Sequence, residues 1–264
     1  TQERMHLRPV GHPRSARDHR GREVADVVRQ RDRRHVDGFR VRSWLGYAEE
    51  HWLELDFGEV EDANGGSLIL VLNGWTDYPY PESIYAAGKA GIDLLPPTLE
   101  YPAADGTWKV WGELGFPAGL TKTITRDVSE LVKLGRGRFR IRTNMQVYWD
   151  EILLARRIAR PRGREIELDV GSAVLRHRGF AREVLPDGRP PIAYDDERLE
   201  PVIVTPWKGR LTRFGDVAEL LRDADDRLVL CGPGEEIEIG FDAGRLAAEP
   251  LNGWVRSFVL RTWG

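Results

Sequence analysis

Residues 138–154, RFRIRTNMQVYWDEILL, decide the fold prediction. From Arg138 to Thr143, arginine alternates with Phe, Ile and Thr, and this period of two places one set of side chains on each face of a β-strand. Asn144 and Met145 indicate a bulge or turn, after which the alternation resumes toward Trp149. The stretch is therefore predicted to be a strand whose aromatic rings pack into a core, with a ligand site only as the second interpretation.

Similar patterns recur along the chain and predict an all-β protein. Strand-like segments before residue 160 are HWLELDFGEV, SLILVLNGW, TKTITRDV and a hairpin around ADG; later ones are EIELDV, AVLRHRGF, RLVLCG, EEIEIGFD and WVRSFVLRTWG. Two short helices are expected, at 81–91 with Ser83 as cap and Gly91 as stop, and at 216–225, where Asp216 and Glu219 resemble a capping box. We expect an antiparallel β-sandwich or jelly roll.

The chain divides by composition into three regions. Residues 1–37 are polar, hold four of the six histidines and are expected to be a solvated arm or a long loop edge. The irregular spacing of His6, His12, His19 and His35 argues against a metal site there. Residues 38–160 are predicted to be a β-sandwich. After RPRGRE (160–165), residues 161–264 form a second β subdomain or the second half of the same sandwich.

Charge and cysteine content exclude several classes. A net charge of -3 and a pI near 6.1 argue against a nucleic-acid binder. No apolar run approaches the roughly 20 residues that span a bilayer. The one cysteine, Cys231, excludes an intrachain disulfide and a cysteine-based zinc site, and its apolar setting predicts a buried small side chain. The chain opens at Thr1 without a signal-peptide pattern, and both ends are expected to be cuts through a longer polypeptide.

No motif for catalysis is recognisable, so we expect no catalytic residue, no metal and no cofactor. GPGEE (232–236) lacks the Lys and following helix of a phosphate loop and is predicted to be a hairpin turn. Paired carboxylates would suit a glycoside hydrolase, and acids gather at YDDERLE (194–200). Asp150 and Glu151 are adjacent on one strand, so they are expected to point to opposite faces and not to form the pair. The turns 61–66 and 102–106 could offer calcium ligands, but ordinary solvated turns are favoured.

Aromatic residues give the main candidate ligand site. NGWTDYPYPES places Trp75, Asp77, Tyr78 and Tyr80 just after a strongly apolar strand, next to Asn73 and Thr76. Flat rings beside amide and carboxylate groups suit sugar rings, and loops at strand ends carry many binding sites. The alternative is that these rings plug the end of a β-sandwich core, with their polar tips satisfied.

Several longer phrases occur together and in order, among them LELDFG, VLNGWTDYPYPES, LLPPTLE, RIRTNMQVYWDEILL, RGFAREVLPDGRPPIAYD and PWKGRLTRFGDVAELL. From about Leu7 onward, the chain resembles the C-terminal region of bacterial FG-GAP repeat proteins with an ASPIC/UnbV domain, related to the cartilage acidic protein family. The resemblance implies an extracytoplasmic part of a multidomain protein and supplies no catalytic residue.

These observations lead to three hypotheses about function. The first is a noncatalytic interaction module that docks on neighbouring domains of the same polypeptide or on other envelope proteins. The second is a carbohydrate-binding module that uses the aromatic loop, and the third is a glycoside hydrolase. Neither nucleic acid nor a membrane span is expected.

Overall fold

The computed structural model describes residues 5–60, 66–160, 163–200, 209–246 and 253–263. The chain divides into two compact units, Thr1–Pro161 and Arg162–Gly264, which are called unit 1 and unit 2 below. The boundary between them falls within the Pro- and Arg-rich stretch 160–165.

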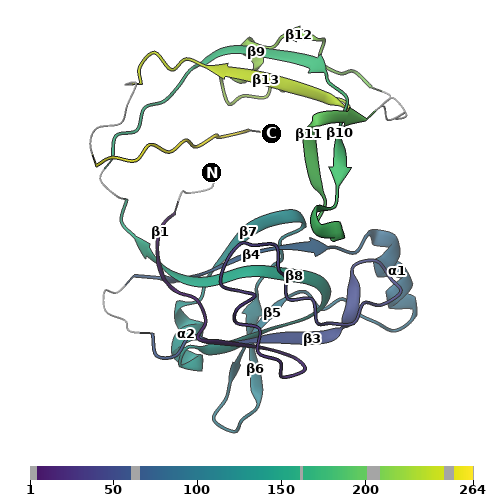
Figure 1. Ribbon diagram of the computed structural model, residues 1–264, viewed down its shortest axis with the longest axis vertical. Helices are drawn as coiled ribbons and strands as arrows, with labels where there is room; N and C mark the ends of the chain where they lie inside the picture. The colour runs from purple at the N-terminus through teal and green to yellow at the C-terminus, as the bar shows by residue number, and fades with distance from the viewer. Residues whose placement is uncertain (1–4, 61–65, 161–162, 201–208, 247–252, 264) are drawn as a thin grey trace. The chain divides into compact units, whose positions relative to one another are not determined.

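Unit 1 is built from antiparallel strands and two short helices (Figure 1). Its strands are β1 (His6–Gly11), β2 (Ser15–Asp18), β3 (Tyr47–Asp56), β4 (Leu68–Asp77), β5 (Thr98–Pro102), β6 (Trp108–Glu113), β7 (Gly119–Asp127) and β8 (Arg138–Ile158). The helices are α1 (Pro81–Lys89) and α2 (Ser129–Gly135).

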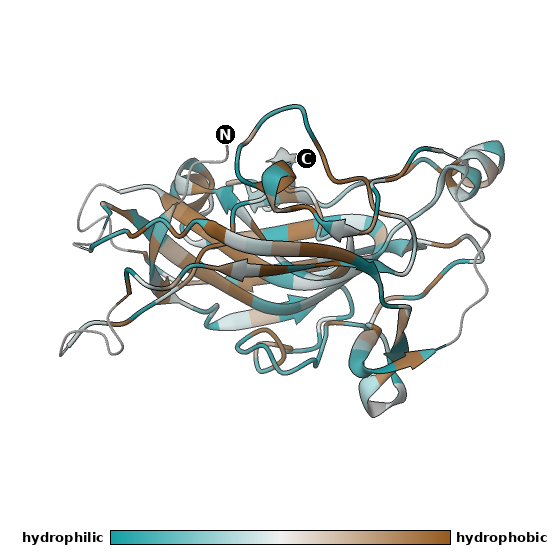
Figure 2. Ribbon diagram, turned by 90° about the horizontal axis from the view of Figure 1, so that it is seen from above, coloured by the Kyte–Doolittle hydropathy of each residue, from teal (hydrophilic) through white to brown (hydrophobic). Residues whose placement is uncertain are grey.

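Strand β8 organises unit 1, because its 21 residues pair with different strands along its length. The first part lies between β3 and β5, and the second part lies between β4 and β1. Alternate side chains of β8, such as Phe139, Ile141 and Val147, are buried together with leucines of β3 and β4. The predicted strand is confirmed. Figure 2 shows brown, hydrophobic bands on the ribbons of the sheet.

The irregularities in the β8 ladders differ from the predicted bulge at Asn144–Met145. There β8 continues without a break, and β3 has the extra residues, between Tyr47 and His51. The bulge in β8 itself lies at Asp150, because Gly74 pairs with Trp149 while the preceding Asn73 pairs with Glu151. Glycine is needed at position 74, since a Cβ there would lie 2.4 Å from the carbonyl oxygen of Tyr148.

The N-terminal region is part of unit 1 and not the solvated arm that its composition suggested. Strand β1 pairs with β8, and β2 pairs with β3. Ala25, Val28 and Val36 then enter the hydrophobic core. The average composition of this region is polar because arginine is abundant. The few, widely spaced apolar residues therefore did not indicate that the region is buried.

One predicted helix is correct and the other is not. Helix α1 occupies the expected place but begins at Pro81, with Tyr80 and not Ser83 at the cap position. Residues 216–225 contain only a 3-10 turn, Ala218–Leu221, where Asp216 Oδ1 accepts the N–H of Ala218. The acidic run that follows is poor in helix formers. The second helix of the protein is α2, which ends at Arg136 in the left-handed conformation.

In the described part of unit 2, the longest strands have eight residues. The strands there are β9 (Val170–His177), β10 (Phe180–Val184), β11 (Ala193–Glu200), β12 (Gly215–Asp216) and β13 (Glu235–Phe241), with a 3-10 turn at Pro186–Gly188. The order β12-β9-β13 forms one antiparallel sheet, and β10 and β11 form a separate hairpin. Its buried apolar cluster consists of Ala173, Leu175, Val217 and Ala218.

The all-β prediction, with antiparallel sheets and two short helices, is confirmed. The finer assignment to a sandwich or jelly roll stays a prediction. Among the described residues, the helices are all too short or too polar to traverse a lipid bilayer.

Candidate functional site

The four candidate ligand-binding residues lie in two settings. Trp75 and Asp77 lie on β4, whereas Tyr78 and Tyr80 follow the strand and lead into α1. Trp75 stacks on Tyr148 of β8, with ring centroids 4.3 Å apart and planes within 6°. One face of its indole ring is therefore covered by the neighbouring strand.

Trp75 belongs to a row of rings that extends across β4, β8 and β3. Phe39 lies 5.0 Å from Tyr148 and stacks on His51 at 4.3 Å. His35 meets the edge of Trp75 at 6.3 Å. Both His35 and Phe39 come from the segment between β2 and β3, so that segment covers this face of the sheet. Trp75 therefore packs against neighbouring rings, but its Nε1 lacks the hydrogen-bond partner, among the described residues, that the core-plug alternative expected.

Burial shifts the pKa values of the groups in this row. It raises the pKa of Tyr148 to about 12, with the carboxylates of Asp77 and Asp37 as smaller causes. It lowers the pKa of His51 to about 4, so this imidazole is neutral at pH 7. Burial also raises the pKa of the Asp77 carboxyl. The Nε1 group of Trp75 is buried and has no hydrogen-bond acceptor among the described residues.

Tyr78 and Tyr80, in contrast, are exposed to solvent. Their rings are 5.6 Å apart and cross at 75°. Helix α1 adds two more exposed side chains, Ile84 and Tyr85. We call Tyr78, Tyr80, Ile84 and Tyr85 the tyrosine tip; it lies where β4 ends and α1 begins (Figure 1).

The backbone beneath the tip is closely packed. Gly46 has a positive φ of 83°, and a Cβ there would lie 2.1 Å from the backbone nitrogen of Pro79. Only glycine allows this approach of the 44–47 turn to the chain between Tyr78 and Tyr80. Pro79 and Pro81 restrict φ on both sides of Tyr80. The exposed rings are therefore carried by a backbone with little freedom.

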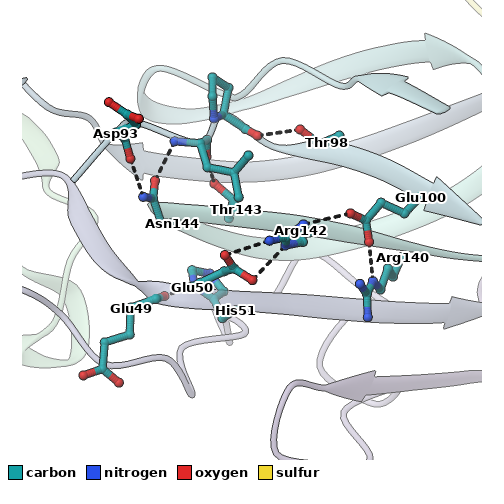
Figure 3. A network of polar contacts seen from close by, with 12 residues as sticks. Glu49, Glu50, His51, Asp93, Thr98, Glu100, Arg140, Arg142, Thr143 and Asn144 are labelled. Carbon is teal, nitrogen blue, oxygen red and sulfur yellow. Dashed lines mark hydrogen bonds and ion pairs between the residues drawn. The ribbon is translucent and has the colours of Figure 1, made fainter. Parts of the chain in front are cut away.

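Arg140 and Glu100 form a buried ion pair (Figure 3), and two tryptophan rings lie beside Arg140. The guanidinium of Arg140 lies 5.0 Å from the ring of Trp52 and 4.6 Å from that of Trp108. Arg140 Nε donates to Glu100 Oε2 at 2.5 Å, and the Glu100 side chain is only 2% exposed. Arg142 bridges Glu100 and Glu50. Each charge has an opposite partner, which fits a role in holding β3, β5 and β8 together.

The Thr-Asn step of β8 fixes a neighbouring loop. Asn144 Oδ1 accepts the N–H of Leu95 and its Nδ2 donates to the carbonyl of Asp93, both at 2.8 Å. Thr143 Oγ1 donates to the carbonyl of Leu95 at 2.8 Å. Figure 3 shows these side chains directed toward residues 93–95. The polar residues of this stretch therefore have structural partners, as the strand interpretation expects.

The bulge at Asp150 changes the prediction for the two adjacent acids. Because Asp150 is the extra residue, simple alternation of faces does not hold there. Its buried carboxylate accepts the N–H of Asp32 at 3.2 Å, and Glu151 accepts from Arg31 at 2.9 Å. Burial raises the pKa of Asp150. Both acids therefore bind residues 31–32, and the bulge interrupts the simple alternation on which their predicted separation to opposite faces was based.

Other predicted positions have local partners. Asp105 in the turn 102–106 accepts the N–H and hydroxyl of Thr107. The turn 61–66 lies almost wholly outside the described residues. Gly232 donates its N–H to Glu235 Oε2 within the turn before β13. Cys231 is partly buried, and burial raises the pKa of its thiol. Over the described ranges, groups of three or more His, Cys, Asp or Glu arranged for a metal do not occur.

An open depression between β6 and β7 was not expected from the sequence. It has a volume of about 430 Å³, and its lining residues are Ser67, Trp111, Arg126, Asp127, Ser129 and Glu130. Arg126 lies over the Trp111 ring at 5.6 Å. The one feature of the sequence that could have indicated this depression is Trp111, on the second strand of the predicted hairpin. The other lining residues come from segments distant in sequence.

Comparison with known proteins adds no relative: no family model, no curated protein and no solved structure matches this chain.

Proposed function

We propose that this chain is a noncatalytic module that binds a protein surface through the tyrosine tip. The partner is a neighbouring domain of the same polypeptide or another protein of the cell envelope. The extracytoplasmic location rests on the resemblance to FG-GAP and ASPIC/UnbV proteins, and is part of the proposal.

One observation carries this proposal: three tyrosine rings are exposed within eight residues, and two of them, Tyr78 and Tyr80, contact each other on a restrained backbone. Tyr78, Tyr80 and Tyr85 present apolar faces together with hydroxyl groups, and Tyr85 is 68% exposed. Tyrosine is enriched in protein interfaces because it offers a large contact area and a hydrogen bond at a low entropic cost. Anchoring by Gly46 and Pro79 lowers that cost further, since the rings need little ordering on binding.

The geometry of the rings favours a protein partner over a sugar. A sugar ring stacks on an open, flat aromatic face. Trp75 is covered on one face by Tyr148, and the rings of Tyr78 and Tyr80 cross at 75° instead of lying in one plane. Such rings fit between the side chains of an irregular protein surface.

A photo-crosslinking experiment tests the proposal. A photoreactive phenylalanine analogue replaces Tyr80 or Tyr85 in the natural full-length protein, expressed in its own host. The control position is Val110 on β6, which is 63% exposed and so matches Tyr85. We expect a discrete product from the tip positions, with the crosslinked peptide in another domain or an envelope protein, and none from Val110. Equal labelling at all three positions would refute a role for the tip.

A second function, carbohydrate binding, is supported by the depression between β6 and β7. Trp111 supplies an aromatic surface there, while Asp127, Glu130 and two serines supply polar groups. Retention on immobilised polysaccharides tests it. If this function is correct, Trp111→Ala abolishes retention and the Tyr80→Ala/Tyr85→Ala double variant retains it. If only the double variant lost retention on the polysaccharide, the sugar site would be at the aromatic loop and not in the depression.

A further inference from the structure

The depression between β6 and β7 contains a guanidinium group without an anionic partner. Arg126 on β7 lies over the ring of Trp111 on β6, 5.6 Å from the ring centroid. Its Nη2 also lies 4.0 Å from the position that a Cβ at Gly112 would take, so the side chain reaches across from β7 to β6. Among the described residues, no carboxylate forms an ion pair with Arg126. Its N–H donors are therefore available to a ligand.

Most other polar groups of the depression are bonded to one another. Asp127 Oδ1 accepts the N–H of Ser129 at 3.0 Å and its hydroxyl at 2.7 Å. Although partial burial raises it, hydrogen bonds from Ser129 and Ser67 bring the pKa of the Asp127 carboxyl below its ordinary value. Of the six lining residues, Arg126 and Glu130 thus have charges that no described side chain pairs with.

Trp111 holds the guanidinium in a position to bind an anion. The indole ring is partly buried and packs against the core of unit 1, so it is a fixed support. A guanidinium is attracted to the face of such a ring. Its planar fork of donors matches a carboxylate, with two parallel N–H···O bonds. Because the ring restricts the side chain before a ligand arrives, less entropy is lost on binding.

Strand β7 carries a second cation on the same face. Ile124 packs against the core of unit 1, and Lys122 and Arg126 lie two residues to either side of it. Alternation places these three side chains on one face of the strand, with the two cations roughly 13 Å apart along it. Within the described ranges, no carboxylate pairs with Lys122. Two such cations favour a ligand that carries an acidic group on more than one of its units.

We propose that the depression binds an acidic polysaccharide, with the carboxylate of one uronic acid unit on the Arg126 guanidinium and a further acidic unit near Lys122. The proposal rests on the second function above and names its ligand class. A singly charged carboxylate fits this site better than a phosphate, because Asp127 and Glu130 add negative charge beside it.

Isothermal titration calorimetry of the 264-residue chain tests this proposal. The ligands are polygalacturonate and the same polymer with its carboxyl groups methyl-esterified. We expect binding of the acidic form alone, weakened by added salt. Arg126→Ala should weaken it at least about tenfold, because charged hydrogen bonds are lost. Arg126→Lys should recover part of the affinity, since it keeps the charge but not the planar fork.

Two further variants serve as controls. Arg8→Ala removes an exposed arginine from β1, which is separated from β7 by β4 and β8, and should leave binding unchanged. Glu130→Gln should strengthen binding about twofold, because it removes a like charge from the depression. Arg126 is exposed, and circular dichroism checks that each variant is folded.

The outcomes separate this proposal from the second function. Equal binding of the acidic and esterified polymers, lost in Trp111→Ala, would leave a sugar site in the depression but overturn the acidic ligand. Binding of dextran sulfate and not of polygalacturonate would assign the guanidinium to a sulfate, and would also overturn it. Equal losses in Arg126→Ala and Arg8→Ala would mean diffuse attraction without a site. If none of these polymers bound, the second function would fail and this proposal with it.

Discussion

Units 1 and 2 share the same sequence pattern but differ in how well their strands are covered. In unit 1 the buried apolar cluster has 22 residues, and in unit 2 it has four, counting described residues only. Strand β8 in unit 1 has neighbours on both sides along much of its length, whereas β13 pairs with one strand in the described part of unit 2. Alternating polar and apolar residues therefore predict a strand, but the stability of that strand depends on the strands and side chains that pack against it.

The largest expected effect is on the core of unit 1. Phe139 is fully buried and stacks on Phe57 at 5.5 Å, so Phe139→Ala should lower the free energy of unfolding of unit 1 by about 3–5 kcal/mol. Leu175→Ala is the matched change in unit 2. Urea unfolding followed by hydrogen exchange of each unit should show separate losses. If each variant destabilised both units equally, the division into two units would be wrong.

The buried ion pair should come next. Glu100→Gln removes the carboxylate that Arg140 and Arg142 share, and should cost unit 1 about 3 kcal/mol. Glu236→Gln in unit 2 breaks contacts to the more exposed Arg176 and Arg178, and should change urea unfolding much less. Similar losses in both variants would mean that burial does not set the strength of these pairs.

A pH dependence should distinguish unit 1. The pKa of His51 is about 4 in the folded protein and 6.5 ordinarily, so the unfolded chain binds more protons between these values. Stability should therefore fall as the pH is lowered from 6.5 toward 4, by about 1 kcal/mol per pH unit from this group. His51→Phe keeps the stacking on Phe39 and should flatten the profile, measured by urea unfolding at several pH values. An unchanged slope would contradict the assignment to His51.

The smallest expected effect on stability is at the tyrosine tip. Tyr80→Ala/Tyr85→Ala removes exposed rings and should change the free energy of unfolding by about 0.5 kcal/mol or less. The same double variant should no longer co-purify with the partner that the crosslinking identifies. A large loss of stability would make these tyrosines part of the fold, and would remove the support for the proposed docking surface.

Local patterns predicted local features well. The alternation through residues 138–143 and the helix at 81–91 depend on near neighbours, and both are present. The partners of these residues were not predictable. Glu100 meets Arg140 across 40 positions of sequence, and Tyr148 meets Trp75 only because β4 and β8 pair in one register. Likewise, Val28 and Val36 are buried because β8 lies beneath them.

The candidate site likewise had a part that local sequence predicted and a part that depended on distant contacts. The aromatic residues after β4 were recognisable, but their exposure was not. Trp75 is covered by Tyr148, while Tyr78 and Tyr80, a few residues later, reach solvent. The depression at Trp111 combines side chains from β6, β7 and α2, which no short motif brings together.

By itself, the sequence determined that this protein is made of antiparallel strands, because the period of two in side-chain polarity is a property of neighbouring residues. The tertiary structure alone decided which rings are buried, which acids meet arginines and which strand edge remains open. Those features depend on pairing register and on the coverage of each face, and both arise from contacts between residues far apart in the chain.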